Sequence, residues 1–322
     1  MTLEHPKYET AEIIQPGGRP LPEALKTRLK LYYVNRGDIK LRVMLANAAT
    51  DTPRGSIIFS PGRTEFIEKY FETIEDLIQR GFNVLMFDPR GQGLSDRLVE
   101  DKLKSYVDDF QSYADDFGFI NEEFLPLFPK PHIAMGHSMG GTIVLQSVIS
   151  GTINPDVVVC SAPMLGLFDL DTPLIRLVIS ALSRLGFAKK NLPFRPQRNG
   201  LPVSFSDNKL TSDKERYRIW ASYFQTTPRM RLGPPTYGWI RAALASMVYL
   251  HRNADKLRVP SLMLAAGADP IVDPTSIQKF AEKSGGDYQV IAGALHELFL
   301  EKDEYRNQTF AYIDAFLEAQ KL

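Results

Sequence analysis

Cysteine, net charge and long apolar runs are what this chain of 322 residues most lacks. Its single cysteine, Cys160, has no partner for an internal disulfide, so nothing indicates adaptation to an oxidising compartment. The 38 basic and 38 acidic residues cancel, and without a basic excess we expect no nucleic-acid partner. No stretch reaches the ~20 apolar residues that are needed to span a bilayer.

Targeting and phosphate-binding signals are missing as well. Residues 1–12 are polar and acidic, with neither the basic start nor the apolar core of a signal peptide. The glycine-rich segment Asp88–Ser95 lacks the lysine and the helix-opening spacing of a phosphate-binding loop, so we interpret it as a structural turn. A cytoplasmic protein is therefore the expectation.

The apolar pattern changes once along the chain. Alternating apolar and polar residues on both sides of the Asn35–Asp38 turn predict a β-hairpin over residues 29–45. Short apolar runs typical of parallel strands buried on both faces follow, at Ser56–Ser60, Val84–Phe87, His132–Met135, Val157–Cys160, Ser261–Ala265 and Tyr288–Ile291. Helical patterns separate most of them or close the chain, at Phe66–Gln79, Tyr106–Glu123, Met139–Ser150, Pro274–Lys283 and Glu301–Gln320. This order predicts an α/β fold with a mostly parallel sheet flanked by helices.

The strand–helix alternation is interrupted between Leu165 and Lys256, where only helical stretches and a proline-rich link, Asn191–Pro202, occur. A continuous sheet does not need these residues. We therefore expect residues 1–164 and 257–322 to form one α/β core and residues 165–256 to form an inserted helical lid.

Ser138 stands where a nucleophile is expected. It lies in the segment Gly136-His137-Ser138-Met139-Gly140-Gly141, directly after the apolar run 133–135 and before the helical run 142–149. A serine on a tight strand-to-helix turn has a strained backbone that raises its hydroxyl above the sheet edge, and the flanking glycines avoid collisions. The helix N-terminus directs free amides to the place where an oxyanion would form. The segment predicts nucleophilic catalysis, with a chance Gly/Ser turn as the alternative.

A serine hydroxyl needs a base, and His296 is the best placed of the five histidines. It follows the last predicted strand and precedes the last predicted helix, so it lies at the carboxyl edge where Ser138 also emerges. The side chain of His137, next to Ser138, should point away from the reacting face. We interpret the four other histidines as structural or surface residues, namely His5, His132, His137 and His251.

An acid must orient the histidine and stabilise its charged form. Asp269 directly follows the apolar strand 262–265 and falls between Ser138 and His296 in chain order, as this fold requires. Asp273 is the alternative, although its position suits the cap of the next helix.

Two backbone amides are predicted to bind the oxyanion. One is that of Met139, the residue after the nucleophile. The other is expected in the loop Ser60–Glu65, where Gly62 permits the turn and Arg63 supplies the amide. A Pro-Gly turn is also a common structural element, so a purely structural loop is the alternative.

With these residues in place, the chain resembles the monoglyceride lipase and bacterial lysophospholipase branch of the α/β hydrolases. The resemblance covers most of the chain and is carried by Phe59–Glu65, Asp88–Ser95, Gly136–Gly141, Gly267–Asp269, Ile271–Asp273 and His296 with Glu297. Two lid segments look more like the bacterial lysophospholipases than the animal lipases, namely Asn208–Asp213 and Gly233–Trp239.

The resemblance implies the triad Ser138, Asp269 and His296, oxyanion amides at Arg63 and Met139, and no metal or cofactor. The chain departs from the family at Pro61-Gly62, where many relatives have His-Gly. A backbone donor needs no particular side chain there, so only the shape of the acyl pocket is affected.

The expected reaction is hydrolysis of a small-molecule ester with a single acyl chain, of the monoacylglycerol or lysophospholipid type, through an acyl-enzyme. The lid contains both tryptophans, and an aromatic lining suits an acyl chain better than a sugar or a charged peptide. Its first helix, Leu174–Leu185, is apolar except for a stripe at Arg176, Ser180 and Arg184. The lid could touch a membrane surface transiently, but a net charge of zero offers no attraction to anionic lipid.

Two alternatives stay open. The same triad could act on small aryl or alkyl esters, thioesters or peptide N-termini, because substrate choice depends on lid contacts. From another class, the chain could be a non-catalytic ligand-binding protein on the same fold. The oligomeric state is not predicted.

Overall fold

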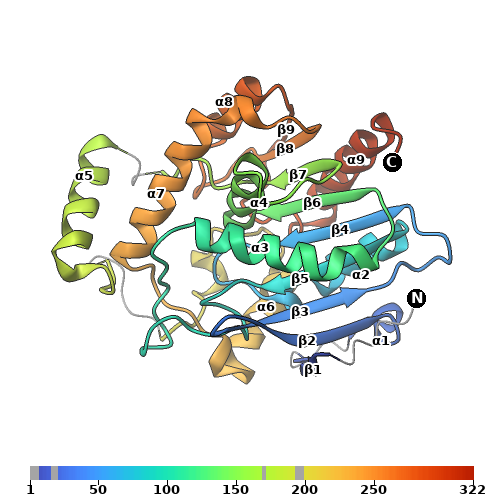
Figure 1. The fold of residues 1–322 in the computed structure, drawn as a ribbon, viewed down its shortest axis with the longest axis horizontal. Helices are drawn as coiled ribbons and strands as arrows, with labels where there is room; N and C mark the ends of the chain where they lie inside the picture. The colour runs from blue at the N-terminus through green and yellow to red at the C-terminus, as the bar shows by residue number, and fades with distance from the viewer. Residues whose placement is uncertain (1–6, 16–20, 169–171, 193–198) are drawn as a thin grey trace.

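The computed structural model describes residues 7–15, 21–168, 172–192 and 199–322 (Figure 1). The described residues form one nine-stranded sheet in the order β1-β2-β3-β5-β4-β6-β7-β8-β9. The strands are β1 (Glu9–Thr10), β2 (Leu29–Arg36), β3 (Ile39–Ala46), β4 (Gly55–Ser60), β5 (Phe82–Asp88), β6 (His132–His137), β7 (Val157–Ser161), β8 (Ser261–Ala266) and β9 (Asp287–Ile291). The neighbours from β5 through β4 to β9 pair in parallel, whereas β1, β2, β3 and β5 pair antiparallel.

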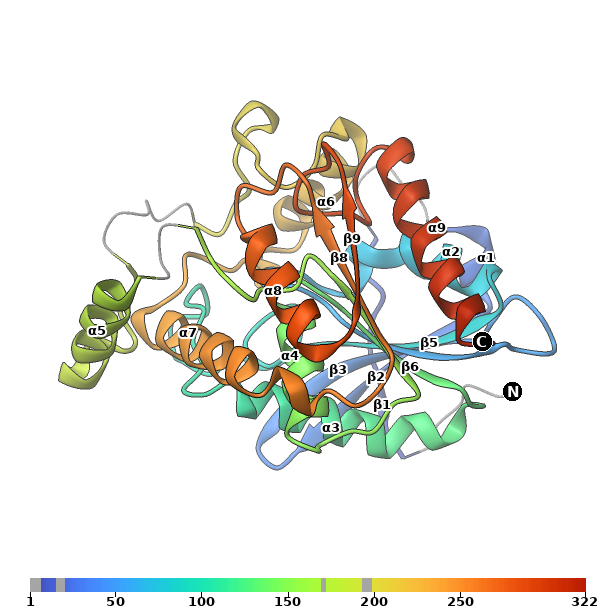
Figure 2. The same cartoon turned by 90° about the horizontal axis from the view of Figure 1, so that it is seen from above.

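Helices cover both faces of this sheet (Figure 2). They are α1 (Glu23–Lys26), α2 (Phe71–Gln79), α3 (Gln111–Phe124), α4 (Met139–Ile149), α5 (Pro173–Leu182), α6 (Lys214–Thr226), α7 (Tyr237–Arg252), α8 (Pro274–Ser284) and α9 (Asp303–Ala319). Successive strand residues alternate between two cores: Ile58 packs with α3, α4, α7 and α8, and Ile57 packs with α1, α2, α6 and α9. The predicted mostly parallel sheet flanked by helices is confirmed.

The carboxyl ends of four strands meet at one edge of the sheet. Ser138 follows β6, and the Ser60–Glu65 loop follows β4, the strand paired with β6. Asp269 follows β8, and His296 follows β9, the strand paired with β8. Parallel pairing therefore brings four distant segments of the chain to one place.

Three predicted elements need correction. The helix predicted over Tyr106–Glu123 begins only at Gln111, because the chain before it is held by the insertion: Ser105 pairs with Pro235, and the carbonyl oxygen of Asp108 accepts a hydrogen bond from Arg241. The pattern Phe66–Gln79 is a 3₁₀ turn over Ile67–Tyr70 followed by α2. The run Tyr288–Ile291 is not buried on both faces, because β9 is the edge strand and Val290 is 38% exposed.

The helices α5, α6 and α7 lie between β7 and β8, where the lid was predicted. No strand occurs in the described part of residues 165–256, apart from isolated bridges. The described residues include no helix with the length and apolar character needed to cross a membrane. Several expectations lie partly or wholly outside the described residues: those for His5, for the N-terminal segment 1–6, for residues 169–171 of the lid, and for 193–198 of its proline-rich link.

Candidate active site

Ser138 lies on the tight turn between β6 and α4. Its backbone angles, φ 52° and ψ −118°, fall in a region that non-glycine residues rarely adopt. A Cβ atom on Gly136 would lie 2.5 Å from the carbonyl oxygen of Gly140, and one on Gly140 would overlap the carbonyl oxygen of Ser60. Close backbone packing therefore requires both glycines, and this packing holds the strained serine in place.

The side chains of Ser138, His296 and Asp269 form one hydrogen-bonded chain. His296 Nε2 lies 2.9 Å from Ser138 Oγ, and His296 Nδ1 lies 2.6 Å from Asp269 Oδ2. With Nδ1–H donated to the carboxylate, Nε2 can accept the serine proton. The second carboxylate oxygen, Asp269 Oδ1, accepts the backbone N–H groups of Ile271 and Val272 at 2.8 and 3.0 Å, which fixes its orientation.

The histidine and the aspartate are almost fully buried, with 4% of His296 and 7% of Asp269 exposed. Burial by itself would lower the pKa of His296, but the Asp269 carboxylate outweighs it, and the pKa lies above its ordinary value of 6.5. The carboxylates of Glu297 and Glu65 act in the same direction. The site therefore favours the imidazolium that forms when Ser138 loses its proton.

The alternative acid and two further histidines are used elsewhere. Asp273 is the N-cap of α8, and its carboxylate accepts hydrogen bonds from the Thr275 amide at 2.9 Å and the Ser276 hydroxyl at 3.1 Å. His132 and His251 each bond through a ring nitrogen to a backbone carbonyl oxygen, at 3.2 and 2.9 Å. These contacts give Asp273, His132 and His251 structural roles.

The two amides predicted to bind the oxyanion, those of Arg63 and Met139, come from segments in contact. A Cβ atom on Gly140 would overlap the carbonyl oxygen of Ser60 and lie 2.6 Å from that of Pro61. The start of α4 therefore packs directly on the loop after β4. This packing supports the assignment of both amides, which stays a prediction.

Side chains from two other segments hold the Arg63 loop. Gln92 Nε2 donates to the carbonyl oxygen of Gly62 at 2.7 Å. Arg63 Nη1 donates to the carbonyl oxygen of Gly233 at 3.1 Å, and its guanidinium lies 5.7 Å from the ring centre of Trp239. The loop after β4 is thus connected directly to the insertion between β7 and β8.

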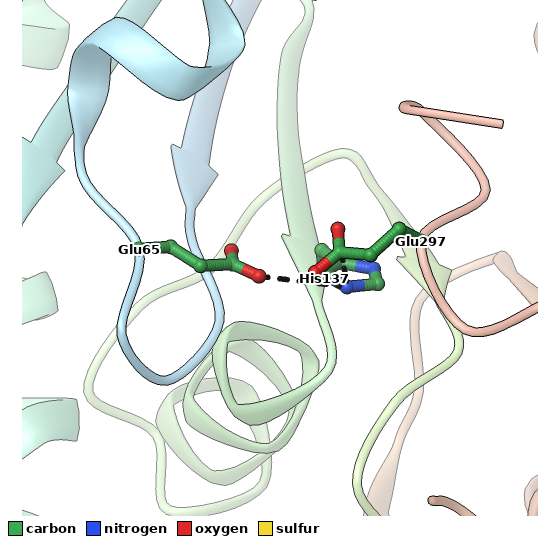
Figure 3. Close-up of side chains that lie close together, drawn as sticks. All are labelled: Glu65, His137 and Glu297. Carbon is green, nitrogen blue, oxygen red and sulfur yellow. Dashed lines mark ion pairs between the residues drawn. The ribbon is translucent and has the colours of Figure 1, made fainter. Parts of the chain in front are cut away.

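A buried charge cluster of Glu65, Lys69, His137 and Glu297 adjoins the triad, and Figure 3 shows three of its members converging from separate segments. Lys69 Nζ lies 2.6 Å from Glu65 Oε1 and 2.7 Å from Glu297 Oε2. His137 Nε2 lies 3.2 Å from Glu297 Oε2, and the ring centres of His137 and His296 are 5.0 Å apart. The cluster therefore connects the loop after β4, which carries Glu65, to the loop that carries His296.

Lys69 also affects the charge state of the two glutamates in this cluster. Burial raises the pKa of Glu65, and the nearby Glu297 carboxylate raises it further. Burial would raise the pKa of Glu297 too, but Lys69 and His137 hold it well below its usual value. Ligand atoms of Glu65, His137 and Glu297 lie within 4.8 Å of one another, as a metal site requires. Because the Lys69 ammonium already pairs with both carboxylates, it supplies the positive charge that a metal would bring, and we assign the cluster a positioning role.

This buried charge cluster was not predicted from the sequence. Glu65 and Glu297 lie inside segments that carry the family resemblance, and Lys69 lies four residues beyond Glu65, but the pairing of Lys69 with Glu297 across 228 residues has no local signature. The signal that could have indicated the cluster is the presence of these charged residues in segments that are buried in the fold. The side chain of His137 turns into this cluster.

A pocket of about 540 Å³ opens beside Arg63 and Thr64 of the loop after β4. Its remaining walls come from the insertion and include Pro202, Lys209, Tyr217, Trp220, Phe224 and the segment 232–235. Trp239 does not line it but packs in the core, where 3% of it is exposed. Part of the aromatic content of the insertion therefore faces the pocket and part holds the insertion to the core.

Residues 51–303 match the family model described as serine aminopeptidase, S33. The chain belongs to the S33 family of α/β hydrolases. The matched S33 segment contains Ser138, Asp269 and His296. Lysophospholipase L2 of Escherichia coli strain K12 is 32% identical over 284 residues, which cover 81% of this chain and 79% of that protein. The probable lysophospholipase L2 of Haemophilus influenzae is 28% identical over 90% of this chain and 92% of its own length.

Among solved structures, this S33-family chain is similar to a soluble variant of the monoglyceride lipase of Saccharomyces cerevisiae in complex with a substrate analogue. The TM-score is 0.74 and the sequence identity is 21%, over 94% of this chain and 99% of that one. This similarity confirms the α/β-hydrolase fold.

Proposed function

We propose that this protein is a serine hydrolase that cleaves esters with a single acyl chain, of the lysophospholipid or monoacylglycerol type. The observation that carries the proposal is the hydrogen-bonded chain from Ser138 through His296 to Asp269. The names of the bacterial relatives support a lipid ester over the peptide that the family description names.

In the proposed reaction, Ser138 Oγ attacks the ester carbonyl carbon while His296 Nε2 accepts the hydroxyl proton. The amides of Arg63 and Met139 bind the oxyanion of the tetrahedral intermediate. Collapse of this intermediate expels the alcohol, which takes the proton from His296, and leaves an acyl-enzyme on Ser138. A water molecule that gives its proton to His296 then attacks the acyl carbonyl carbon, and the bond to Ser138 Oγ breaks as that oxygen takes the proton back from His296, which releases the fatty acid. The reaction needs no metal or cofactor.

The 540 Å³ pocket is the proposed binding site for the substrate, because it borders the oxyanion loop at Arg63. Its aromatic wall at Tyr217, Trp220 and Phe224 suits an acyl chain, whereas Lys209 offers a charge to an anionic headgroup. We further propose that residues 165–256 act as the lid over this pocket. A cytoplasmic location and transient contact of the lid with a membrane surface stay predictions.

The test is hydrolysis of p-nitrophenyl esters from acetyl to palmitoyl, together with monoacylglycerol and lysophosphatidylcholine. The proteins are the wild type, Ser138→Ala and the matched control Ser150→Ala, an exposed serine at the end of α4. We expect medium or long acyl chains to be preferred, with all activity lost in Ser138→Ala and retained in Ser150→Ala.

Other outcomes favour the alternatives. Activity on acetyl or butyryl esters alone would replace the lipid ester with a small ester. Absence of Ser138-dependent turnover of every ester would contradict the proposal, and thioesters and peptide N-termini would then be tested before a purely ligand-binding role.

A further inference from the structure

The glycine-rich turn Asp88–Ser95 brings one buried side chain to the loop after β4. The turn follows β5, which pairs in parallel with β4, so both connections leave the sheet at the same edge. Gln92 lies in this turn between Gly91 and Gly93, and 2% of it is exposed. A buried carboxamide needs hydrogen-bond partners, and Gln92 has partners in the loop after β4.

The carboxamide of Gln92 bonds to the backbone on both sides of Arg63. Its Nε2 donates to the carbonyl oxygen of Gly62 at 2.7 Å. Its Oε1 accepts the backbone N–H of Thr64 at 3.3 Å. One side chain thus holds the peptide group before Arg63 and the peptide group after it.

The first of these peptide groups contains the amide proposed to bind the oxyanion. The carbonyl of Gly62 and the N–H of Arg63 belong to one planar, trans peptide group, so they point in opposite directions. A donor that holds the carbonyl therefore also sets the direction of the N–H. If this plane turned over, a carbonyl oxygen, which repels an oxyanion, would take the place of the N–H.

The backbone of this loop is strained and needs such support. Thr64 has a φ of 65°, in the left-handed region that non-glycine residues rarely adopt. On the other side of Arg63, the Glu65 carboxylate accepts the N–H of Gly62. The backbone of Gly62 is therefore held through its N–H by Glu65 of the buried charge cluster and through its carbonyl by Gln92.

Asp88 fixes the turn relative to the loop. Its Oδ2 accepts the backbone N–H of Leu94 at 2.8 Å, within the turn, and its Oδ1 accepts that of Ile67 at 2.9 Å, just beyond the loop. A Cβ atom on Gly93 would lie 2.2 Å from the carboxyl carbon of Asp88, so the residue after Gln92 must be glycine. The turn therefore places the Gln92 side chain at a fixed position against the loop.

We propose that Gln92 is a positioning residue for catalysis, which holds the Gly62–Arg63 peptide group so that the Arg63 amide binds the oxyanion. The inference rests on the proposed function, and it gives the glycine-rich turn a role beyond that of a structural turn. Gln92 is not among the described residues that line the 540 Å³ pocket, so it acts through the backbone of the loop. Its removal should weaken binding of the transition state and leave binding of the substrate nearly unchanged.

The test compares steady-state hydrolysis of p-nitrophenyl butyrate and laurate by wild type, Gln92→Met and Gln146→Met. Methionine is close to glutamine in length but cannot donate a hydrogen bond. Gln146 is the matched control, because it is also buried and bonds through its carboxamide to Gln111 and Ser246. We expect kcat of Gln92→Met to fall about 100-fold with KM changed less than about threefold. The control should keep the kcat of wild type.

A second variant keeps the polarity of the site. Gln92→Asn retains a carboxamide but is one methylene too short to keep both bonds, and we expect kcat to fall about tenfold or more. Thermal unfolding of all the variants measures the structural cost. A loss of stability in the Gln92 variants without a fall in kcat would show a merely structural role and overturn the inference.

A third measurement examines the oxyanion itself. A long-chain alkyl trifluoromethyl ketone accepts Ser138 Oγ at its carbonyl carbon while His296 takes the proton, which leaves a tetrahedral adduct with a negative oxygen. We expect its inhibition constant to rise about 100-fold in Gln92→Met, in parallel with the loss of kcat, and to stay unchanged in Gln146→Met.

The outcomes separate this inference from the proposed function. Turnover by wild type with an undiminished kcat in Gln92→Met, or a change in KM alone, would overturn the positioning role and leave the proposed function in place. Absence of Ser138-dependent turnover by wild type would instead remove the proposed function and this inference with it.

Discussion

At the scale of single residues, Asp269 and Asp273 lie four positions apart but have different roles: Asp269 bonds to His296, whereas Asp273 caps α8. Asp269→Asn keeps the shape of the side chain but not the charge that holds His296 in its tautomer, so we expect kcat to fall roughly 10⁴-fold with little change in KM. Asp273→Asn keeps a good helix cap and should change kcat less than about twofold. Steady-state kinetics on a soluble ester compare the two, and a larger loss in Asp273→Asn would contradict the assignment.

The raised pKa of His296 predicts how activity depends on pH. Only the neutral imidazole accepts the proton of Ser138, so kcat/KM should rise with pH through a pKa above 6.5. In Asp269→Asn the neighbour that raises this pKa most is lost, and the acidic limb should move to lower pH. A pH–rate profile of each protein measures the shift, and coincident acidic limbs would show that Asp269 does not control this titration.

The contribution of His296 to folding stability depends on pH in the opposite direction from activity, because it decreases as the pH rises. Because the pKa of His296 is higher in the folded state than in the unfolded chain, its contribution to stability is fully present below the unfolded value of 6.5. This contribution is lost as the pH rises through the folded pKa. Urea unfolding should therefore show a larger stability difference between wild type and His296→Gln at acidic than at alkaline pH, whereas the reverse order would be inconsistent with a raised pKa.

At the scale of elements, the buried charge cluster connects the loop after β4 to the loop after β9. Glu297→Gln removes a negative charge that raises the pKa of His296, so the acidic limb of kcat/KM should move to lower pH. It also leaves Lys69 with Glu65 as its carboxylate partner in the cluster, and we expect a loss of about 1–3 kcal/mol in the free energy of unfolding.

The control for the cluster is Glu282→Gln, which changes an exposed carboxylate on α8. A merely structural cluster would lower the stability of Glu297→Gln without moving its pH profile. That result would remove the positioning role that we assign to Glu297.

Elements that depend on local sequence could be predicted, and those fixed by distant contacts could not. The turn from β6 to α4 is specified by glycines within two residues of Ser138, so its position and strain follow from the sequence. The start of α3 is different, because residue 105 pairs with Pro235 of the insertion. The pairing of Lys69 with Glu297 is equally non-local, which is why the triad was predicted and the cluster behind it was not.

At the scale of the whole molecule, one side chain attaches the insertion to two parts of the core. Arg216 of α6 donates to the Glu72 carboxylate of α2 at 2.7 Å and to the Asp303 carboxylate of α9 at 2.7 Å. It also donates to the backbone carbonyl oxygen of Glu301 at 2.8 Å. Removing this guanidinium should loosen α6 from the core.

We expect Arg216→Met to lose roughly 1–3 kcal/mol of stability and to be cleaved faster within the insertion during limited proteolysis. Arg218→Met is the matched control, because Arg218 is exposed and pairs with Glu215 on its own helix. Thermal unfolding and the proteolysis time course measure both effects. Equal behaviour of the two variants would show that Arg216 does not attach α6.

The sheet and its order of elements could be predicted because strands and helices alternate regularly along the chain. The attachment of the insertion through Arg216 could not, because Glu72 and Asp303 lie 144 and 87 residues away from Arg216 along the chain.

The central claim is that Ser138 carries the acyl group, and mass spectrometry of the protein trapped during turnover tests it most directly. Wild type, Ser138→Ala and Ser150→Ala are quenched with acid while they hydrolyse p-nitrophenyl laurate. We predict one lauroyl group on the peptide that contains Ser138 in wild type and Ser150→Ala, and neither adduct nor turnover in Ser138→Ala. Continued hydrolysis by Ser138→Ala, or an acyl group on another residue, would contradict the account.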